Sequence, residues 1–126
     1  MDAALSANMI EGMEGYFRLI ESFLPEWRIN AQKLFGARGI QGQIVASPNT
    51  GLLYHYERSW TWNFWTPGAG WLVSYFYDYY RFTGDKDFLK NRVVPIMKDI
   101  ALFYEDFLTE KNADGHYIYR LIRVLN

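Results

Sequence analysis

The sequence predicts a mostly helical, all-α chain of about four helices interrupted by one long loop. Apolar residues recur at the three-to-four spacing of a helix face within residues 5–35, 71–82 and 94–109. Residues 36–66 lack this period and are interrupted by the turn-forming residues Gly39, Gly42, Pro48, Asn49 and Gly51. The composition, 50% hydrophobic and 21% charged, is that of a globular chain.

Length and charge narrow the possible functions. A chain of 126 residues has room for one domain. A net charge of -1 offers no basic patch for nucleic acid, and no apolar run is long enough for a membrane span. The absence of cysteine excludes disulfides and thiolate metal sites. Met1-Asp2 lacks the basic start of a signal peptide, and the compartment stays open.

The first helix is expected over residues 5–24. One face carries the apolar residues Met9, Met13, Phe17, Ile20 and Leu24. Gly12 and Gly15 each weaken a helix by about 1 kcal/mol relative to alanine, so the early half is the weaker half.

A second, short helix is expected to restart at Pro25, because proline suits the first helical position. Gly36 supplies its end. Its buried side consists of Trp27, Ala31, Leu34 and Phe35.

Residues 36–66 form the long loop, in which Ile40, Ile44 and Val45 are a possible short strand. Loops of this length are usually functional. Three tryptophans lie near its end, at Trp60, Trp62 and Trp65. They serve either as a hydrophobic plug or as a recognition surface such as a stacking platform for sugar rings. Asn49-Thr50 offers hydrogen bonds to sugar hydroxyls, although a turn role suits Asn49 equally.

The aromatic helix at 71–82 carries a single polar stripe, formed by Ser74, Asp78 and Arg81. A helix that is apolar on its other sides is expected to be buried on nearly all sides. With a tryptophan loop at its entrance, it suggests the inner wall of a helical barrel.

The remaining chain is expected to alternate short turns and helices. Gly84 ends the aromatic helix and Asp85 caps the next one, a short turn at 87–92. A last helix follows over 94–109. Residues 112–115 read as a turn and 116–119 as a possible strand.

The acidic residues do not form a self-sufficient catalytic set. Asp78 on the aromatic helix is a candidate acid, but an ion pair with Arg81 is the simpler interpretation. Glu105 and Asp106 are expected to be a solvated face. His55 and His116 lack acidic neighbours at metal-ligand spacing, so no metal and no cofactor is predicted.

Several motifs together resemble glycoside hydrolase family 95, the inverting α-L-fucosidase group with related α-L-galactosidases. The motifs are GARG at 36–39, Asn49-Thr50, WTPGAGW at 65–71, TGD at 83–85 followed by Phe88-Leu89, and PIMK at 95–98. The resemblance implies that residues 1–126 are one segment of an (α/α)6 barrel whose ligand is a carbohydrate. It also implies that Trp65 lines the sugar pocket and that Asn49-Thr50 belongs to a pocket-side loop, with Trp60 and Trp62 nearby.

The same resemblance implies that no catalytic residue lies in this chain. The family's asparagine pair, its general acid in a Ser-Pro-Glu-Asn motif and its base match no position here, so the chain alone is expected to be inactive. Residues 120–126 do not match the family pattern, as expected if the reading frame had shifted near Arg120. The alternative is a non-catalytic helical module that binds carbohydrate or partners and self-associates through its aromatic face.

Overall fold

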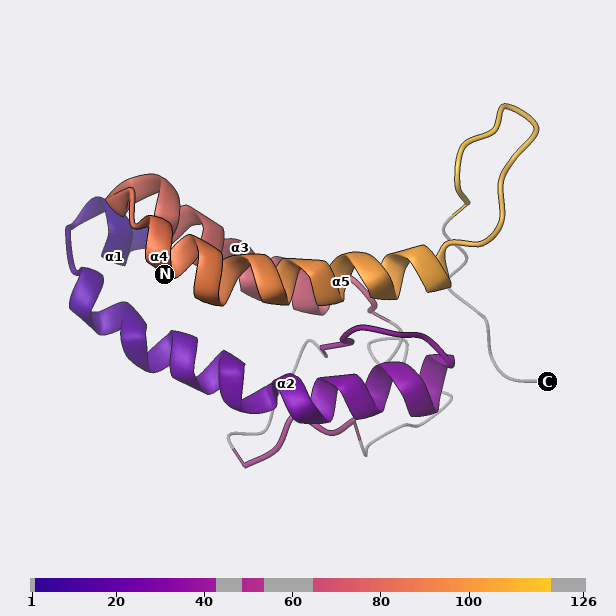
Figure 1. The fold of residues 1–126 in the computed structure, drawn as a ribbon, viewed down its shortest axis with the longest axis horizontal. Helices are drawn as coiled ribbons and strands as arrows, with labels where there is room; N and C mark the ends of the chain where they lie inside the picture. The colour runs from indigo at the N-terminus through magenta and orange to yellow at the C-terminus, as the bar shows by residue number, and fades with distance from the viewer. Residues whose placement is uncertain (1, 43–48, 54–64, 119–126) are drawn as a thin grey trace.

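The computed structural model describes residues 2–42, 49–53 and 65–118. Within these ranges the prediction of a mostly helical chain is confirmed. The elements are α1 (Asp2–Ser6), the 3₁₀ turn η1 (Ile10–Gly12), α2 (Met13–Phe35), α3 (Gly68–Thr83), α4 (Lys86–Phe88), the π-helical turn η3 (Leu89–Val93) and α5 (Val94–Phe107) (Figure 1).

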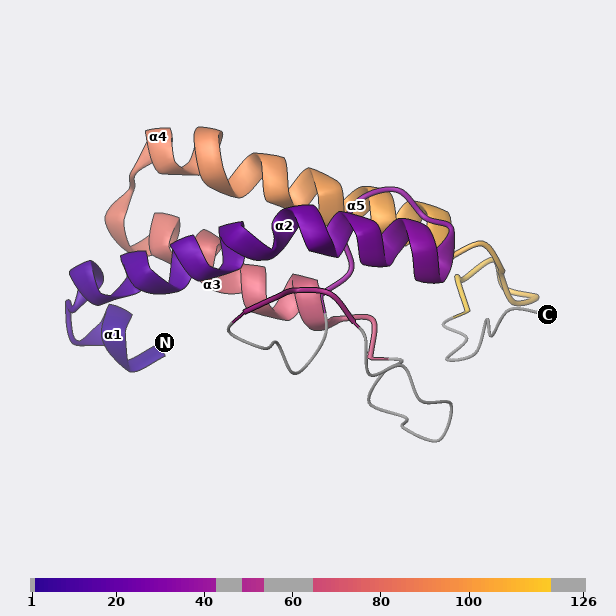
Figure 2. The ribbon, with the colours of Figure 1, turned by 90° about the horizontal axis from the view of Figure 1, so that it is seen from below.

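Three long helices lie side by side and enclose the core. Figures 1 and 2 show α3 and α5 running in opposite directions, joined at one end through α4, with α2 packed along both. A tight group of rings lies between them: the centroid of Phe17 is 4.6 Å from that of Phe76 and 5.0 Å from that of Phe88. All three side chains are buried. These apolar contacts between helices are the main force that holds the segment together.

The predicted break at Pro25 is wrong, because α2 passes through it as one helix of 23 residues. Proline removes one backbone hydrogen bond, but burial of Phe23 and Trp27 on either side keeps both halves against the same core. Figure 1 shows α2 changing direction near its middle, as a helix with an internal proline often does. The break lies earlier instead, around Asn8, whose φ of 54° is left-handed.

The aromatic helix α3 is not buried on nearly all sides, contrary to the prediction. Val73 and Phe76 are buried, but Trp71 is 56% exposed and Phe82 is 62% exposed. The reason is geometric: α2 and α5 cover one side of α3, and the described residues include no third helix against its other side. Tyr77 shares the exposed side.

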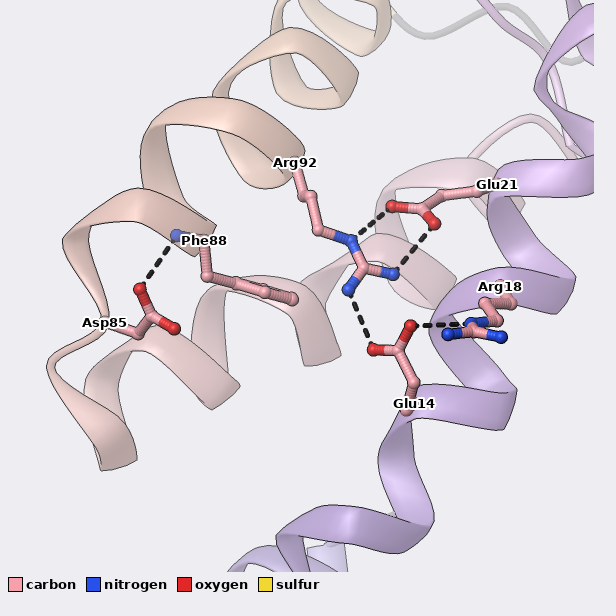
Figure 3. A network of polar contacts seen from close by, with 6 residues as sticks. All are labelled: Glu14, Arg18, Glu21, Asp85, Phe88 and Arg92. Carbon is pink, nitrogen blue, oxygen red and sulfur yellow. Dashed lines mark hydrogen bonds and ion pairs between the residues drawn. The ribbon is translucent and has the colours of Figure 1, made fainter.

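The turn between α3 and α4 has the predicted caps. Gly84 takes the left-handed conformation with a φ of 70°, and its N–H donates to the carbonyl of Tyr80 at 2.7 Å. The carboxylate of Asp85 accepts from the N–H of Phe88 at 2.9 Å (Figure 3). The predicted short helix at 87–92 falls within α4 and η3.

Arg92 in η3 ties this turn to α2. Its guanidinium donates to both carboxylate oxygens of Glu21, at 2.6 and 2.8 Å, and to Glu14 at 2.8 Å (Figure 3). The same guanidinium lies 4.9 Å from the centre of the Phe88 ring. Glu14 also accepts a hydrogen bond from Arg18. The hydrogen bond from Arg92, followed by the one from Arg18, lowers the pKa of Glu14.

After α5 the described chain forms a turn. The side-chain oxygen of Asn112 accepts from the N–H groups of Asp114 and His116, which confirms the predicted turn. In place of the expected strand, Lys111 and Tyr117 make a single antiparallel bridge. Tyr119 lies outside the described residues, as do Ile44 and Val45 of the other possible strand, whose Ile40 is in no strand. Among the described helices, none has the length and apolarity that a membrane span needs.

Candidate functional site

The carboxyl-terminal half of α2 carries a contact face, here called the α2 seat, for two described segments of the long loop, residues 36–42 and 49–53. Four side chains make this α2 seat: Phe23 and the residues three, four and seven positions after it, which are Glu26, Trp27 and Asn30. At this spacing they share one face of the helix. Trp27 is fully buried and Asn30 is 3% exposed. A buried amide in this position must find hydrogen-bond partners, and it finds them in the loop.

Asn30 joins two separate segments of the loop. Its amide nitrogen donates to the carbonyl of Gly51 at 2.8 Å and to that of Gln41 at 3.3 Å. Its side-chain oxygen accepts from the N–H of Leu53 at 3.0 Å. The N–H of Gly51 donates to the carboxylate of Glu26, one helical turn before Asn30. The seat therefore fixes the loop through backbone groups.

Two glycines allow the loop to lie flat on Trp27. A Cβ on Gly42 would stand 2.9 Å from the indole ring, and one on Gly51 would stand 2.9 Å from both Trp27 and Phe23. Real Cβ atoms do not approach rings that closely, so any side chain would push the loop off the seat. The sequence pattern alone indicates that Gly42 and Gly51 are turn-forming residues. In the structure their lack of a side chain is what allows the close contact with α2.

The predicted pocket residues Asn49 and Thr50 come directly before this anchored stretch. Asn49 is exposed and Thr50 is half-buried, with its hydroxyl accepting from the N–H of Leu52 at 3.0 Å. The seat thus grips the backbone at Gly51 while Asn49 faces solvent.

Trp65 lies just before α3 and contacts that helix. Its ring is half-buried and meets Trp71 edge to face, with centroids 5.7 Å apart. The next residue, Thr66, is buried, and its carbonyl accepts from the hydroxyl of Tyr104 in α5 at 3.1 Å. Burial raises the pKa of that Tyr104 hydroxyl. Trp60 and Trp62 lie outside the described residues.

The GARG stretch connects α2 to α5. Gly36 ends α2 in the left-handed conformation, as predicted. Gly39, with a φ of 75°, passes so close to α5 that a Cβ would stand 1.9 Å from the carbonyl oxygen of Asp99. Between them, Arg38 binds Asp106 through paired hydrogen bonds of 2.7 and 2.9 Å.

Glu105 is exposed, as expected of a solvated face, and Asp106 is half-buried; on this surface both carboxylates bind Arg38. Arg38 binds Asp106 and also reaches Glu105 at 2.8 Å, because the turn after α2 carries the guanidinium across to α5. The side-chain and backbone hydrogen bonds from Arg38 lower the pKa of Asp106 to about 2.

Asp78 carries the predicted ion pair, with Arg81 at 3.6 Å. Among the residues that the structure describes, no three acidic or histidine side chains gather as metal ligands would. Three buried polar atoms of the described part lack a hydrogen-bond partner: Nε1 of Trp27, Oε1 of Gln41 and Oγ1 of Thr66.

Sequence reasoning missed Glu26 and Asn30. The available signal was a polar pair at i and i+4 that flanks the buried Trp27, where an amphipathic helix would have apolar residues. The sequence does not show what these residues bind, because their partners are backbone groups 11 to 25 residues further along the chain.

Comparison with known proteins gives a consistent result. The family model described as the glycosyl hydrolase family 95 catalytic domain matches residues 3–121. The chain is 29% identical over 118 residues to a protein named alpha-L-fucosidase 2 from Arabidopsis thaliana, and the match covers 89% of this chain and 13% of that protein. No solved structure matches. Because the family's catalytic-domain model matches nearly all of this chain, the chain belongs to glycosyl hydrolase family 95.

Proposed function

We propose that this chain is one segment of an (α/α)6-barrel catalytic domain that hydrolyses terminal α-L-fucosides or related α-L-glycosides. Its contribution is to one side of the sugar pocket, through Trp65 and the Asn49-Thr50 loop, with Trp60 and Trp62 in the same loop region. The observation that carries the proposal is the family match over residues 3–121. The name of the Arabidopsis relative supports the choice of fucose.

The geometry around the proposed residues suits a sugar. Trp65 and Trp71 form an edge-to-face pair in which Trp71 is 56% exposed, so an aromatic surface is accessible to the apolar face of a pyranose ring. Asn49 is exposed, and a side-chain amide of this type carries both donor and acceptor groups. Stacking and hydrogen bonding of this kind are the usual basis of sugar recognition.

Catalysis by this chain alone is not expected. Many of its acidic side chains are held by arginines, including Glu14 by Arg92 and Asp106 by Arg38. The pKa of each of these two carboxylates is lowered, whereas a general acid needs its pKa raised. An inverting glycosidase also needs an acid and a base about 6.5–9.5 Å apart with a water between them.

The test is a titration of the purified chain with L-fucose, followed by nuclear magnetic resonance of the tryptophan indole N–H signals. We expect the Trp65 signal to shift in the wild type and L-fucose affinity to fall in Trp65→Ala, whereas D-glucose shifts it less. Absence of any fucose-dependent shift would count against the proposed pocket. An aryl α-L-fucoside assay in parallel is expected to show no turnover by the chain alone.

A second candidate function is self-association through α3, which the exposed side of that helix favours. Trp71, Tyr77 and Phe82 are each at least 41% exposed, and large exposed aromatics commonly mark interfaces. Asp78 and Arg81 lie on the same helix with opposite charges, so a two-fold contact would place the acid of one copy near the base of the other. Sedimentation equilibrium at micromolar concentration decides it: a single mass near 14.9 kDa excludes a stable dimer.

A further inference from the structure

Glu26 and Asn30 of the α2 seat both bind the short backbone segment 51–53 that follows Asn49-Thr50. We propose that Glu26 and Asn30 are positioning residues that hold Asn49-Thr50 in place for sugar binding. This inference rests on the proposed function, which puts Asn49-Thr50 at the sugar pocket.

The two side chains fix the segment at three points. Glu26 accepts from the N–H of Gly51, Asn30 donates to the carbonyl of Gly51 at 2.8 Å, and Asn30 accepts from the N–H of Leu53 at 3.0 Å. Both polar groups of the Gly51 backbone are therefore satisfied by one face of α2. Because the peptide bond between Thr50 and Gly51 is planar, fixing the N–H of Gly51 also fixes the orientation of the Thr50 carbonyl.

The polar contacts and the steric contacts act on the same residue. Gly51 is buried against Phe23 and Trp27, and an added Cβ would stand 2.9 Å from each. A shift of the segment by one residue would bring Thr50 or Leu52 into this place, where neither side chain fits. The register of Asn49-Thr50 relative to α2 is consequently fixed.

Asn30 is an unusual residue for a buried helix face, and its contacts explain its presence. An amide that is 3% exposed adds nothing to apolar packing, and its side-chain hydrogen bonds go to Gln41, Gly51 and Leu53 and not to its own helix. All of them go to loop backbone, so the polar side chain serves the position of the loop. Glu26, one helical turn earlier, also binds loop backbone, by accepting from the N–H of Gly51.

Exposure decreases along the stretch from Asn49 to Gly51. Asn49 is exposed and Thr50 is half-buried, while Gly51 beneath them is buried. The seat thus binds the loop from the core side at Gly51, and Asn49 is exposed. Binding groups held rigidly by supporting hydrogen bonds lose less conformational freedom when a ligand binds.

The experiment compares Glu26→Ala, Glu26→Gln and the control Glu21→Ala in the full chain. Glu21 lies on the same helix and also forms a long-range hydrogen bond, but to Arg92 rather than to the loop. Two quantities are measured by nuclear magnetic resonance: the hydrogen-exchange rate of the Gly51 amide and the affinity for L-fucose. Thermal unfolding of each variant reports the loss of general stability.

For Glu26→Ala we expect exchange at Gly51 about tenfold faster and L-fucose binding about tenfold weaker, as loss of one charge-assisted hydrogen bond implies. Glu26→Gln keeps an acceptor oxygen and is expected to restore most of both. Glu21→Ala is expected to lower the melting temperature without changing either quantity.

Three results would overturn the inference. One is an unchanged exchange rate at Gly51 in Glu26→Ala. Another is a faster exchange rate with unchanged fucose affinity, which leaves the proposed function standing but denies the positioning role. The third is an equal loss of affinity in Glu21→Ala. If the wild-type chain binds no L-fucose while Gly51 still responds to Glu26→Ala, the proposed function fails first and the role in sugar binding fails with it.

Discussion

The guanidinium of Arg38 binds the carboxylate of Asp106 through paired hydrogen bonds of 2.7 and 2.9 Å, although 68 residues separate them. The backbone N–H of Arg38 donates to the same carboxylate at 2.7 Å. The turn after α2 is thereby fastened to the last turn of α5. Paired contacts of this type are short and directional, so they define how the two helix ends meet.

This contact predicts a stability difference that disappears in acid. The pKa of Asp106 is lowered to about 2 in the folded state, against about 3.8 ordinarily. A lowered pKa means that the charged form is favoured on folding, so the stabilisation is complete above about pH 4 and is lost as pH falls towards 2. We expect wild type to exceed Asp106→Asn in melting temperature at pH 7 and to match it at pH 2. A difference that persists unchanged at pH 2 would contradict the assignment.

A second prediction separates three glycines that look alike in the sequence. Gly36 and Gly39 both have positive φ, but only at Gly39 would a Cβ collide with backbone, 1.9 Å from the carbonyl oxygen of Asp99. Gly15 lies inside α2 with open space around it. We expect Gly36→Ala to lower the free energy of unfolding by about 1–2 kcal/mol. Gly39→Ala should cost clearly more, and Gly15→Ala should raise stability by about 0.5–1 kcal/mol.

Urea denaturation of the three variants checks this order. Gly15→Ala is the matched control, because it adds the same methyl group at a helical φ without a new contact. If Gly39→Ala proved no worse than Gly36→Ala, the close approach of the loop to α5 would be contradicted.

The parts of the fold that the sequence predicted are those that depend on near neighbours. The ends of α2 and α3 at Gly36 and Gly84 follow from the freedom of glycine to take positive φ, and the cap at Asp85 follows from a side chain three residues from its partner. The predicted helix break at Pro25 is wrong because the packing of α2 against the core overrides the local preference of proline.

The parts that the sequence did not predict depend on distant partners. Asn30 pairs with backbone up to 23 residues away, and Arg92 pairs with Glu14 across 78 residues. Which charges meet is decided only once the helices are packed. The same reason explains the exposed rings of α3: composition shows that a helix is apolar but not which of its sides have neighbours.

A third prediction concerns alkaline pH. The hydroxyl of Tyr16 donates to the carbonyl of Leu72 at 2.6 Å, and burial, with a smaller effect of Tyr75, raises its pKa to about 12. The folded state therefore resists ionisation of Tyr16, whereas the unfolded chain ionises near pH 10. Stability is unaffected below about pH 10 and falls as pH rises from 10 to 12.

Tyr16→Phe removes this ionisation. We expect the variant to be less stable than wild type at pH 8 by about 1 kcal/mol, through loss of one hydrogen bond, and to lose stability less steeply above pH 10. Tyr104, whose pKa is also raised, accounts for part of the slope that remains. The measurement is urea denaturation at several pH values from 8 to 11. Parallel curves for the two proteins would show that Tyr16 does not titrate as described.

The last prediction tests whether the shape of Arg92, beyond its charge, holds η3 against α2. Its guanidinium contacts Glu21 through two hydrogen bonds and Glu14 through a third (Figure 3). It also lies over the rings of Phe17 and Phe88. A lysine keeps the charge but lacks the planar fork that binds both oxygens of Glu21 at once. We expect Arg92→Lys to lower the free energy of unfolding by about 1–2 kcal/mol, because at least one charge-assisted hydrogen bond is lost.

The matched control is Arg18→Lys on α2. Arg18 also binds Glu14, at 2.8 Å, but its side chain is 77% exposed, against 24% for Arg92. Water screens the exposed pair, so this substitution should change stability by less than about 0.5 kcal/mol. Urea denaturation at 0.1 and 1 M sodium chloride distinguishes the two sites, since salt should abolish the small effect at Arg18 and leave most of the effect at Arg92. Equal losses at both positions would mean that the fork of Arg92 contributes no more than that of the exposed Arg18.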